Sequence, residues 1–117
     1  MTSRERILKA ISDERERQIK KWGPCQRLRD VPTARFKQGL STFEFFGLPH
    51  AKQAQWWCGE ASKTKESTWT HVMLEEFAEV LEEAENGNTE ALKKELVQCC
   101  AVLVRWLEDI ELREQGK

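Results

Sequence analysis

Apolar residues recur at steps of three and four positions along two neighbouring stretches, 70–86 and 89–110. This spacing is typical of amphipathic helices, because it places the apolar side chains on one face. Gly87 lies between the stretches and can adopt the left-handed conformation that ends a helix, while Asn88 or Thr89 can cap the next one. The pattern predicts an antiparallel helical hairpin in which two apolar faces pack together. These faces comprise Met73, Phe77, Val80, Leu81 and Ala84 in the first helix, and Leu92, Leu96, Cys99, Leu103, Trp106 and Ile110 in the second.

Two further helices are predicted before the hairpin. Residues 3–22 place apolar side chains on one face among many charges. Thr2 or Ser3 can cap this helix, and Gly23-Pro24 ends it, because glycine terminates a helix and proline cannot continue it. Another helix can begin at Pro49, since proline is tolerated in the first turn.

The remaining segments are predicted to be irregular. Residues 23–48 are divided by glycines and prolines but hold four phenylalanines, so we expect an ordered connection that packs on the helices, over the mouth of any active site. A disordered lid is the alternative. The tail from Leu112 to Lys117 should fray. The chain is therefore predicted to form a single all-α domain over residues 1–117, a small bundle of about four helices built on the antiparallel helical hairpin.

Acidic residues gather on the polar side of the hairpin. Glu79 and Glu95 each lie eight residues from Gly87, and Glu76 and Gln98 each lie eleven residues from it. With a rise of about 1.5 Å per residue, the members of each pair lie at the same height above the turn. Their side-chain oxygens could therefore converge between the helices, and hard cations such as Mg²⁺ favour oxygen ligands. A solvated acidic surface is the alternative, because Glu-rich helix faces are common.

The same residues resemble the motif of a known family. LEEFAEVLEEA supplies Glu75, Glu76 and Glu79, and KKELVQ supplies Glu95 and Gln98. This arrangement resembles the Glu-Glu-x-x-Glu and Glu-x-x-Asp signature of the MazG-type nucleoside triphosphate pyrophosphohydrolases, in the all-α NTP pyrophosphatase superfamily. The flanking segments STWTHVMLEEFAEVLEEA, ELVQCCAVLVRWLEDI and ERERQIKKWG are similar to phage-type members. The resemblance covers roughly the first 22 and the last 50 residues, and does not extend to the middle of the chain.

The resemblance implies a specific reaction and a set of residue roles. The reaction is hydrolysis of a nucleoside triphosphate to a nucleoside monophosphate and pyrophosphate, with Mg²⁺, or alternatively Mn²⁺, as cofactor. The metal ligands would be Glu76, Glu79, Glu95 and Gln98, and a catalytic carboxylate, Glu75 or Glu76, would position or activate the attacking water. Family members assemble as dimers or tetramers, so a homodimer or homotetramer is expected.

One motif position departs from the signature, because Gln98 stands where the family has Asp. A glutamine oxygen can coordinate a hard cation but carries no charge, which should weaken metal binding. This departure leaves a second interpretation open, a catalytically decayed helical-bundle protein that binds another protein through Trp56, Trp57 or the 23–48 connection.

Four residues outside the motif are candidates for binding the substrate. Trp22 could stack on a nucleobase and Gln18 could hydrogen-bond its edge, although Trp22 as a core residue with Gln18 at its rim is the simpler interpretation. Lys21 is a candidate phosphate contact. Arg105 could also bind a phosphate, although an ion pair with Asp109, four residues later, is the simpler explanation.

Charge is unevenly distributed along the 117 residues, although the net charge is only −1. Residues 1–65 carry 14 Lys and Arg against 7 Asp and Glu, whereas residues 66–117 carry 5 against 13. The acidic half could hold cations while the basic half faces phosphates, or the two halves could attract each other on folding or across a dimer. Nucleic-acid binding is not expected, because acids alternate with basic residues along residues 3–22.

The sequence lacks the patterns of a secreted or membrane protein. The first residues contain no apolar signal core, and the longest apolar run, 99–104, is far too short to span a bilayer. We therefore expect a cytoplasmic protein with reduced cysteines and no membrane partner. A zinc site can be imagined, but no ligand spacing supports one; it would use Cys25, Cys58, His50 and His71.

Overall fold

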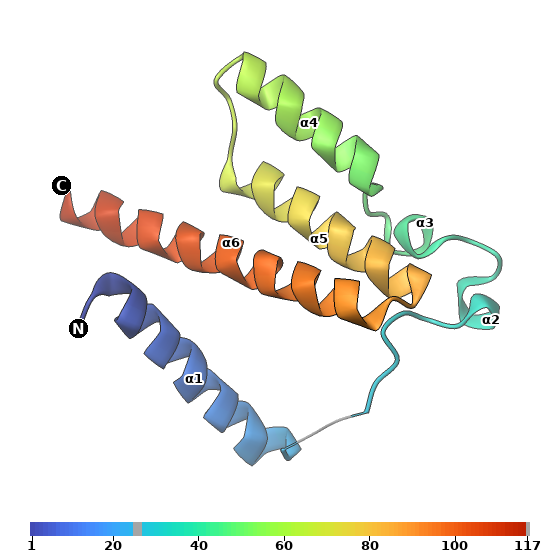
Figure 1. Cartoon of the computed structure of the whole chain (residues 1–117), viewed down its shortest axis with the longest axis horizontal. Helices are drawn as coiled ribbons and strands as arrows, with labels where there is room; N and C mark the ends of the chain where they lie inside the picture. Colours follow the sequence, from blue (N-terminus) through green and yellow to red (C-terminus); the bar gives the residue numbers. More distant parts are fainter. Residues whose placement is uncertain (25–26, 117) are drawn as a thin grey trace. The chain divides into compact units, whose positions relative to one another are not determined.

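A computed structural model describes residues 1–24 and 27–116, which contain six helices and no strand (Figure 1). The all-α prediction is confirmed, and the difference from about four helices lies in two short ones, α2 and α3. The helices are α1 (Ser3–Trp22), α2 (Ala34–Lys37), α3 (Thr42–Phe46), α4 (Ala51–Lys63), α5 (Trp69–Asn86) and α6 (Thr89–Gln115). None of the helices in the described ranges is long and apolar enough to cross a membrane.

The chain divides into two compact units. One unit comprises Met1–Leu28 and Leu103–Lys117, and the other comprises Arg29–Val102. Helix α6 therefore contributes its first part to the second unit and its last part to the first.

In the first unit, α1 is joined to the end of α6 by polar contacts. Arg4 and Arg6 each form an ion pair of 3.4 Å, with Glu108 and Glu111 respectively. The hydroxyl of Ser3 donates a hydrogen bond to Glu111. Exposed pairs of this kind contribute little to stability, about 0–1 kcal/mol each. They show that the charged side of α1 is turned in part toward α6.

Most helix ends lie where their capping residues predict. Thr2 caps α1 in a reciprocal capping box, and Gly23 ends the helix with a φ of 89°. Thr68 caps α5, which ends at Gly87 with a φ of 70°, in the left-handed region that glycine adopts without steric cost. The side chain of Asn88 then accepts a hydrogen bond from the first turn of α6.

Two predicted boundaries are wrong. Helix α4 begins at Ala51 with His50 in the capping position, so Pro49 precedes the helix instead of forming its first turn. Helix α6 continues to Gln115, whereas fraying was predicted from Leu112. The end of α6 belongs to the same unit as α1, where Glu108 and Glu111 contact α1.

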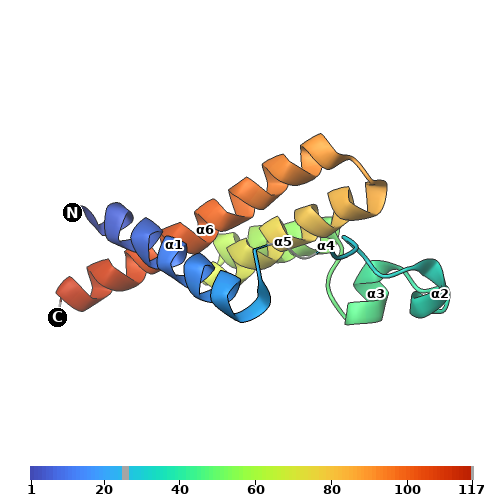
Figure 2. The same cartoon turned by 90° about the horizontal axis from the view of Figure 1, so that it is seen from below.

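The main buried cluster lies between α3, α4 and α5. It comprises Phe43, Ala51, Ala54, Ala78 and Leu81, with Leu48 packed against it. Figures 1 and 2 show α4 alongside α5, with α5 turning back into α6. The antiparallel hairpin is thus present, but the prediction that its two apolar faces bury each other holds only in part. Side chains on the α6 face stay exposed, because α5 uses its apolar residues against α4; Leu96 and Leu103 are 45% and 43% exposed.

The described part of the 23–48 connection packs on α5 through a buried lysine. The Nζ atom of Lys37 lies 2.8 Å from the Glu85 carboxylate and 3.0 Å from the Thr42 hydroxyl. The backbone N–H of Thr42 donates to the same Glu85 oxygen at 3.2 Å. Phe43, the next residue, enters the hydrophobic core. The expected ordered connection is therefore confirmed from residue 27 onward, while its place over an active-site mouth stays a prediction.

Candidate metal centre

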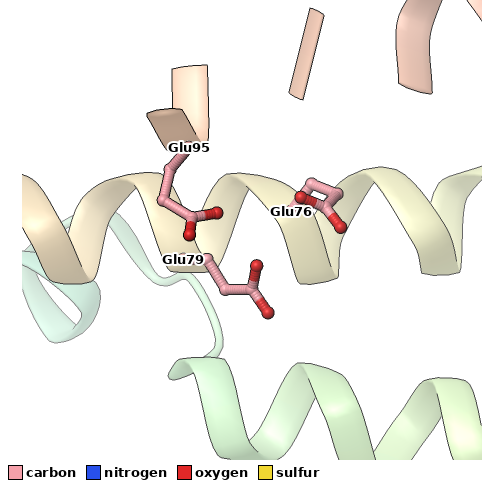
Figure 3. Close-up of side chains that lie close together, drawn as sticks. All are labelled: Glu76, Glu79 and Glu95. Atoms are coloured by element: carbon pink, nitrogen blue, oxygen red, sulfur yellow. The ribbon is translucent and has the colours of Figure 1, made fainter. Parts of the chain in front are cut away.

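Three glutamates converge where α5 faces the first part of α6. Glu76 and Glu79 come from α5 and Glu95 from α6, and one carboxylate oxygen of each lies within 4.8 Å of the other two (Figure 3). Ligand oxygens on a single Mg²⁺ ion lie roughly 3 to 4 Å apart, since each Mg–O bond is about 2.1 Å. Small side-chain rotations would bring this triad to bonding distance. Counting residues from Gly87 thus correctly predicted that these three side chains meet.

The triad carries buried negative charge without nearby compensation. One oxygen of Glu76 and one of Glu95, both Oε2, are buried and lack a hydrogen-bond partner among the described residues. Burial, and then the charges of Glu95 and Glu75, raise the pKa of Glu76. Burial, and then a hydrogen bond to Glu79 and its charge, raise the pKa of Glu95. Because buried polar atoms normally have partners, these two oxygens fit a cation as their missing partner.

The other two motif residues lie beside the triad. Gln98 is exposed on α6, about one turn beyond Glu95. Glu75 is turned toward α4, where burial comes first, and the hydrogen bond and charge of Glu75 come next, in raising the pKa of the Cys58 thiol. The ligand role of Gln98 and the catalytic role of Glu75 both stay predictions.

Helix α4 forms a wall of the site that the sequence did not indicate. A cleft of about 340 Å³ lies beside the triad. The Nε2 atom of Gln55 donates a long hydrogen bond of 3.5 Å to Glu79 in this cleft. No spacing rule could have selected these residues, because polar pairs three apart are common on helices. The cleft is lined by Ala51, Lys52, Gln55, Glu79, Glu82, Glu83 and Glu95.

The predicted base-binding residues belong to the unit formed by residues 1–28 and 103–117, whereas the triad belongs to the other unit. Trp22 is 53% exposed, so its interpretation as a core residue is wrong for the single chain. The Nζ atom of Lys21 lies 5.0 Å from the centre of the Trp22 ring, within cation–π range. Gln18 is half-buried and accepts a hydrogen bond of 3.2 Å from Arg15. Their contacts with a substrate stay predictions.

Arg105 is exposed on α6 and belongs to the same unit as Trp22. Asp109, its suggested ion-pair partner, forms an ion pair of 3.5 Å with Arg113. Neither the proposed phosphate contact of Arg105 nor its pairing with Asp109 is decided by this geometry.

The imagined zinc ligands have other surroundings. The Nδ1 atom of His71 lies 2.6 Å from the Thr68 hydroxyl in the cap of α5. The ring of His50 packs against Phe43, with ring centres 4.8 Å apart. Cys25 lies outside the described residues. The described members of this set are therefore engaged in capping and packing contacts.

Comparison with protein-family models, with curated proteins and with solved structures gave no significant match. The resemblance to the MazG-type enzymes therefore rests on the motif residues themselves. The function built on it is a proposal, developed next.

Proposed function

We propose that this protein is a MazG-like nucleoside triphosphate pyrophosphohydrolase that depends on Mg²⁺ or, alternatively, Mn²⁺. The products would be a nucleoside monophosphate and pyrophosphate. The convergence of Glu76, Glu79 and Glu95 carries the proposal, since it supplies an all-oxygen site in which two carboxylate oxygens lack partners. The motif resemblance supports it independently, because the three glutamates occupy signature positions.

Each motif residue has a role that its chemistry can perform. Glu76, Glu79 and Glu95 would hold the cation, and Gln98 would add a neutral oxygen after its side chain rotates inward. When bound, a divalent cation neutralises phosphate oxygens and orients the leaving pyrophosphate. Glu75 or Glu76 would position the attacking water and accept its proton as the new phosphorus–oxygen bond forms. A raised pKa, as at Glu76, makes a carboxylate a stronger base.

The remaining roles concern the rest of the substrate and assembly. Gln18 and Trp22 would contact the base, and Lys21 and Arg105 the phosphates. We further propose a homodimer or homotetramer. Apolar side chains exposed on α6 support self-association, since they would otherwise face water; they include Leu96, Leu103 and Leu107.

The proposal is tested by pyrophosphate release from a panel of canonical and modified nucleoside triphosphates. Glu79→Gln should reduce turnover below detection in the presence of Mg²⁺, because it removes a charged ligand from the centre of the triad. Glu90→Gln is the matched control, since Glu90 lies in the first turn of α6 and its side chain is 86% exposed. Absence of turnover with every nucleotide, in both Mg²⁺ and Mn²⁺, would refute the enzyme assignment.

A catalytically decayed interaction protein is the second candidate. Two adjacent tryptophans on α4 favour it, because Trp56 and Trp57 are 60% and 39% exposed and exposed tryptophan is enriched at interfaces. Thermal unfolding separates the two candidates. Protection by Mn²⁺ supports a working metal centre, whereas the same unfolding temperature with and without Mn²⁺ supports the decayed protein.

A further inference from the structure

The cleft beside the triad is strongly acidic and contains a single basic side chain among its described lining residues. Glu82 and Glu83 line it together with Glu79 and Glu95, while α4 contributes Lys52. Four carboxylates outweigh one ammonium group, so a polyanion can enter only together with cations. The position of Lys52 then becomes informative, because it is the group of this wall that can contact an anion by charge.

The orientation of α4 is fixed by a neighbouring residue. Gln55 lies three positions after Lys52, so both share one helix face. Its hydrogen bond to Glu79 shows that this face is turned toward the triad. Lys52 is exposed and forms no ion pair with the described residues. Its ammonium group is therefore available to a ligand, although carboxylates line the same cleft.

We propose that Lys52 is a phosphate-binding residue that contacts the phosphate chain of a metal-bound triphosphate from the α4 side of the cleft. This inference rests on the proposed function, since it requires divalent cations at the triad. A lysine ammonium offers three donors on a flexible stem and forms charge-assisted hydrogen bonds with phosphate oxygens. The cleft is at the small end of the range for ligand sites. We therefore place the phosphates inside it and the nucleoside outside.

The test uses inorganic tripolyphosphate, which carries the phosphate chain without a nucleoside. The full chain, saturated with Mn²⁺, is titrated calorimetrically with tripolyphosphate supplied as its Mn²⁺ complex, so that the ligand does not remove metal from the protein. Lys52→Gln should weaken binding about tenfold, the size expected for one charge-assisted hydrogen bond. Lys52→Arg should stay within about threefold of the wild type, because it keeps the charge and the donors.

Two controls separate a phosphate contact from other effects. Lys63→Gln removes an exposed lysine at the far end of the same helix, where it pairs with Glu60, and should leave tripolyphosphate binding unchanged. Titration with Mn²⁺ alone should show that Lys52→Gln binds the metal at least as tightly as the wild type, because a positive charge near the carboxylates has been removed. Loss of Mn²⁺ binding in this variant would assign Lys52 to the metal site and overturn the proposal.

The two proposals fail in distinguishable ways. If the wild-type protein binds no Mn²⁺, the proposed function fails, and the role of Lys52 fails with it. If Mn²⁺ binds but tripolyphosphate does not, or binds wild type and Lys52→Gln equally, the metal centre survives and only the role of Lys52 is refuted.

Discussion

Replacing Glu95 by Gln removes one of the three charges that meet between α5 and α6, while it keeps the size of the side chain. The magnitude follows from the spacing of the carboxylate oxygens, which lie within 4.8 Å of one another. Two unit charges at this distance repel by roughly 1 kcal/mol in water and by roughly 3 kcal/mol at the effective dielectric constant of a protein surface. Because the triad is partly solvated, we expect the metal-free variant to be about 1–2 kcal/mol more stable than the wild type.

The same substitution should abolish stabilisation by metal. A cation that binds only the folded protein at 100 times its dissociation constant raises the free energy of unfolding by about 2.7 kcal/mol. Glu95→Gln loses a charged ligand and should gain little at the same Mn²⁺ concentration. Urea unfolding followed by tryptophan fluorescence, first with EDTA and then with Mn²⁺, measures both effects on one protein. Glu90→Gln should behave as wild type within about 0.5 kcal/mol in both conditions, as a surface substitution does.

The opposite signs of the two effects make this prediction demanding. A hydrogen-bonding role for Glu95 in the folded structure would make the metal-free variant less stable. A diffuse acidic surface would leave both measurements unchanged. Either result would refute the view that Glu76, Glu79 and Glu95 repel one another until a cation joins them.

Three further outcomes are expected from other features. Because the pKa values of Glu76 and Glu95 are raised above their ordinary 4.5, the folded metal-free protein binds more protons than the unfolded chain just above that pH. Its free energy of unfolding should therefore fall as pH rises through the raised values, and urea unfolding should show a shallower fall in the double Gln variant. Lys37→Met should reduce the free energy of unfolding by about 3 kcal/mol, because it leaves Glu85 without its buried partner, whereas no measurable loss would refute the anchoring role. Gln98→Asp should tighten Mn²⁺ binding roughly tenfold in calorimetry by adding a charged ligand, and unchanged affinity would show that residue 98 is not a ligand.

Local signals in the sequence were sufficient for most helix ends and for the meeting of three glutamates. Thr2, Thr68 and Gly87 act on backbone groups within a few residues, so their effects need no knowledge of the fold. The heights of Glu79 and Glu95 follow from the constant rise of a helix on either side of a short turn. Such features depend on distances along the chain that the sequence states directly.

The features that were missed depend on partners far away in sequence. An amphipathic face indicates that a helix packs, but not against which element, so the burial of α5 against α4 was not foreseen. The two helices between residues 34 and 46 have the same origin, because the burial of Lys37 depends on Glu85, 48 residues later. Lys52 and Gln55 likewise gain significance only once α4 lies beside Glu79. Tertiary context, which propensity does not encode, determined each of them.

The short connection at Gly87 also limits how this protein can vary. Each added residue would advance the phase of α6 by about 100°, so one insertion at this loop would tend to turn the Glu95 side chain away from Glu76 and Glu79. An insertion of three or four residues that continued the helix would restore the phase but shift the height by about one turn. Homologues that retain the site should therefore conserve the length of this loop, even where its composition changes.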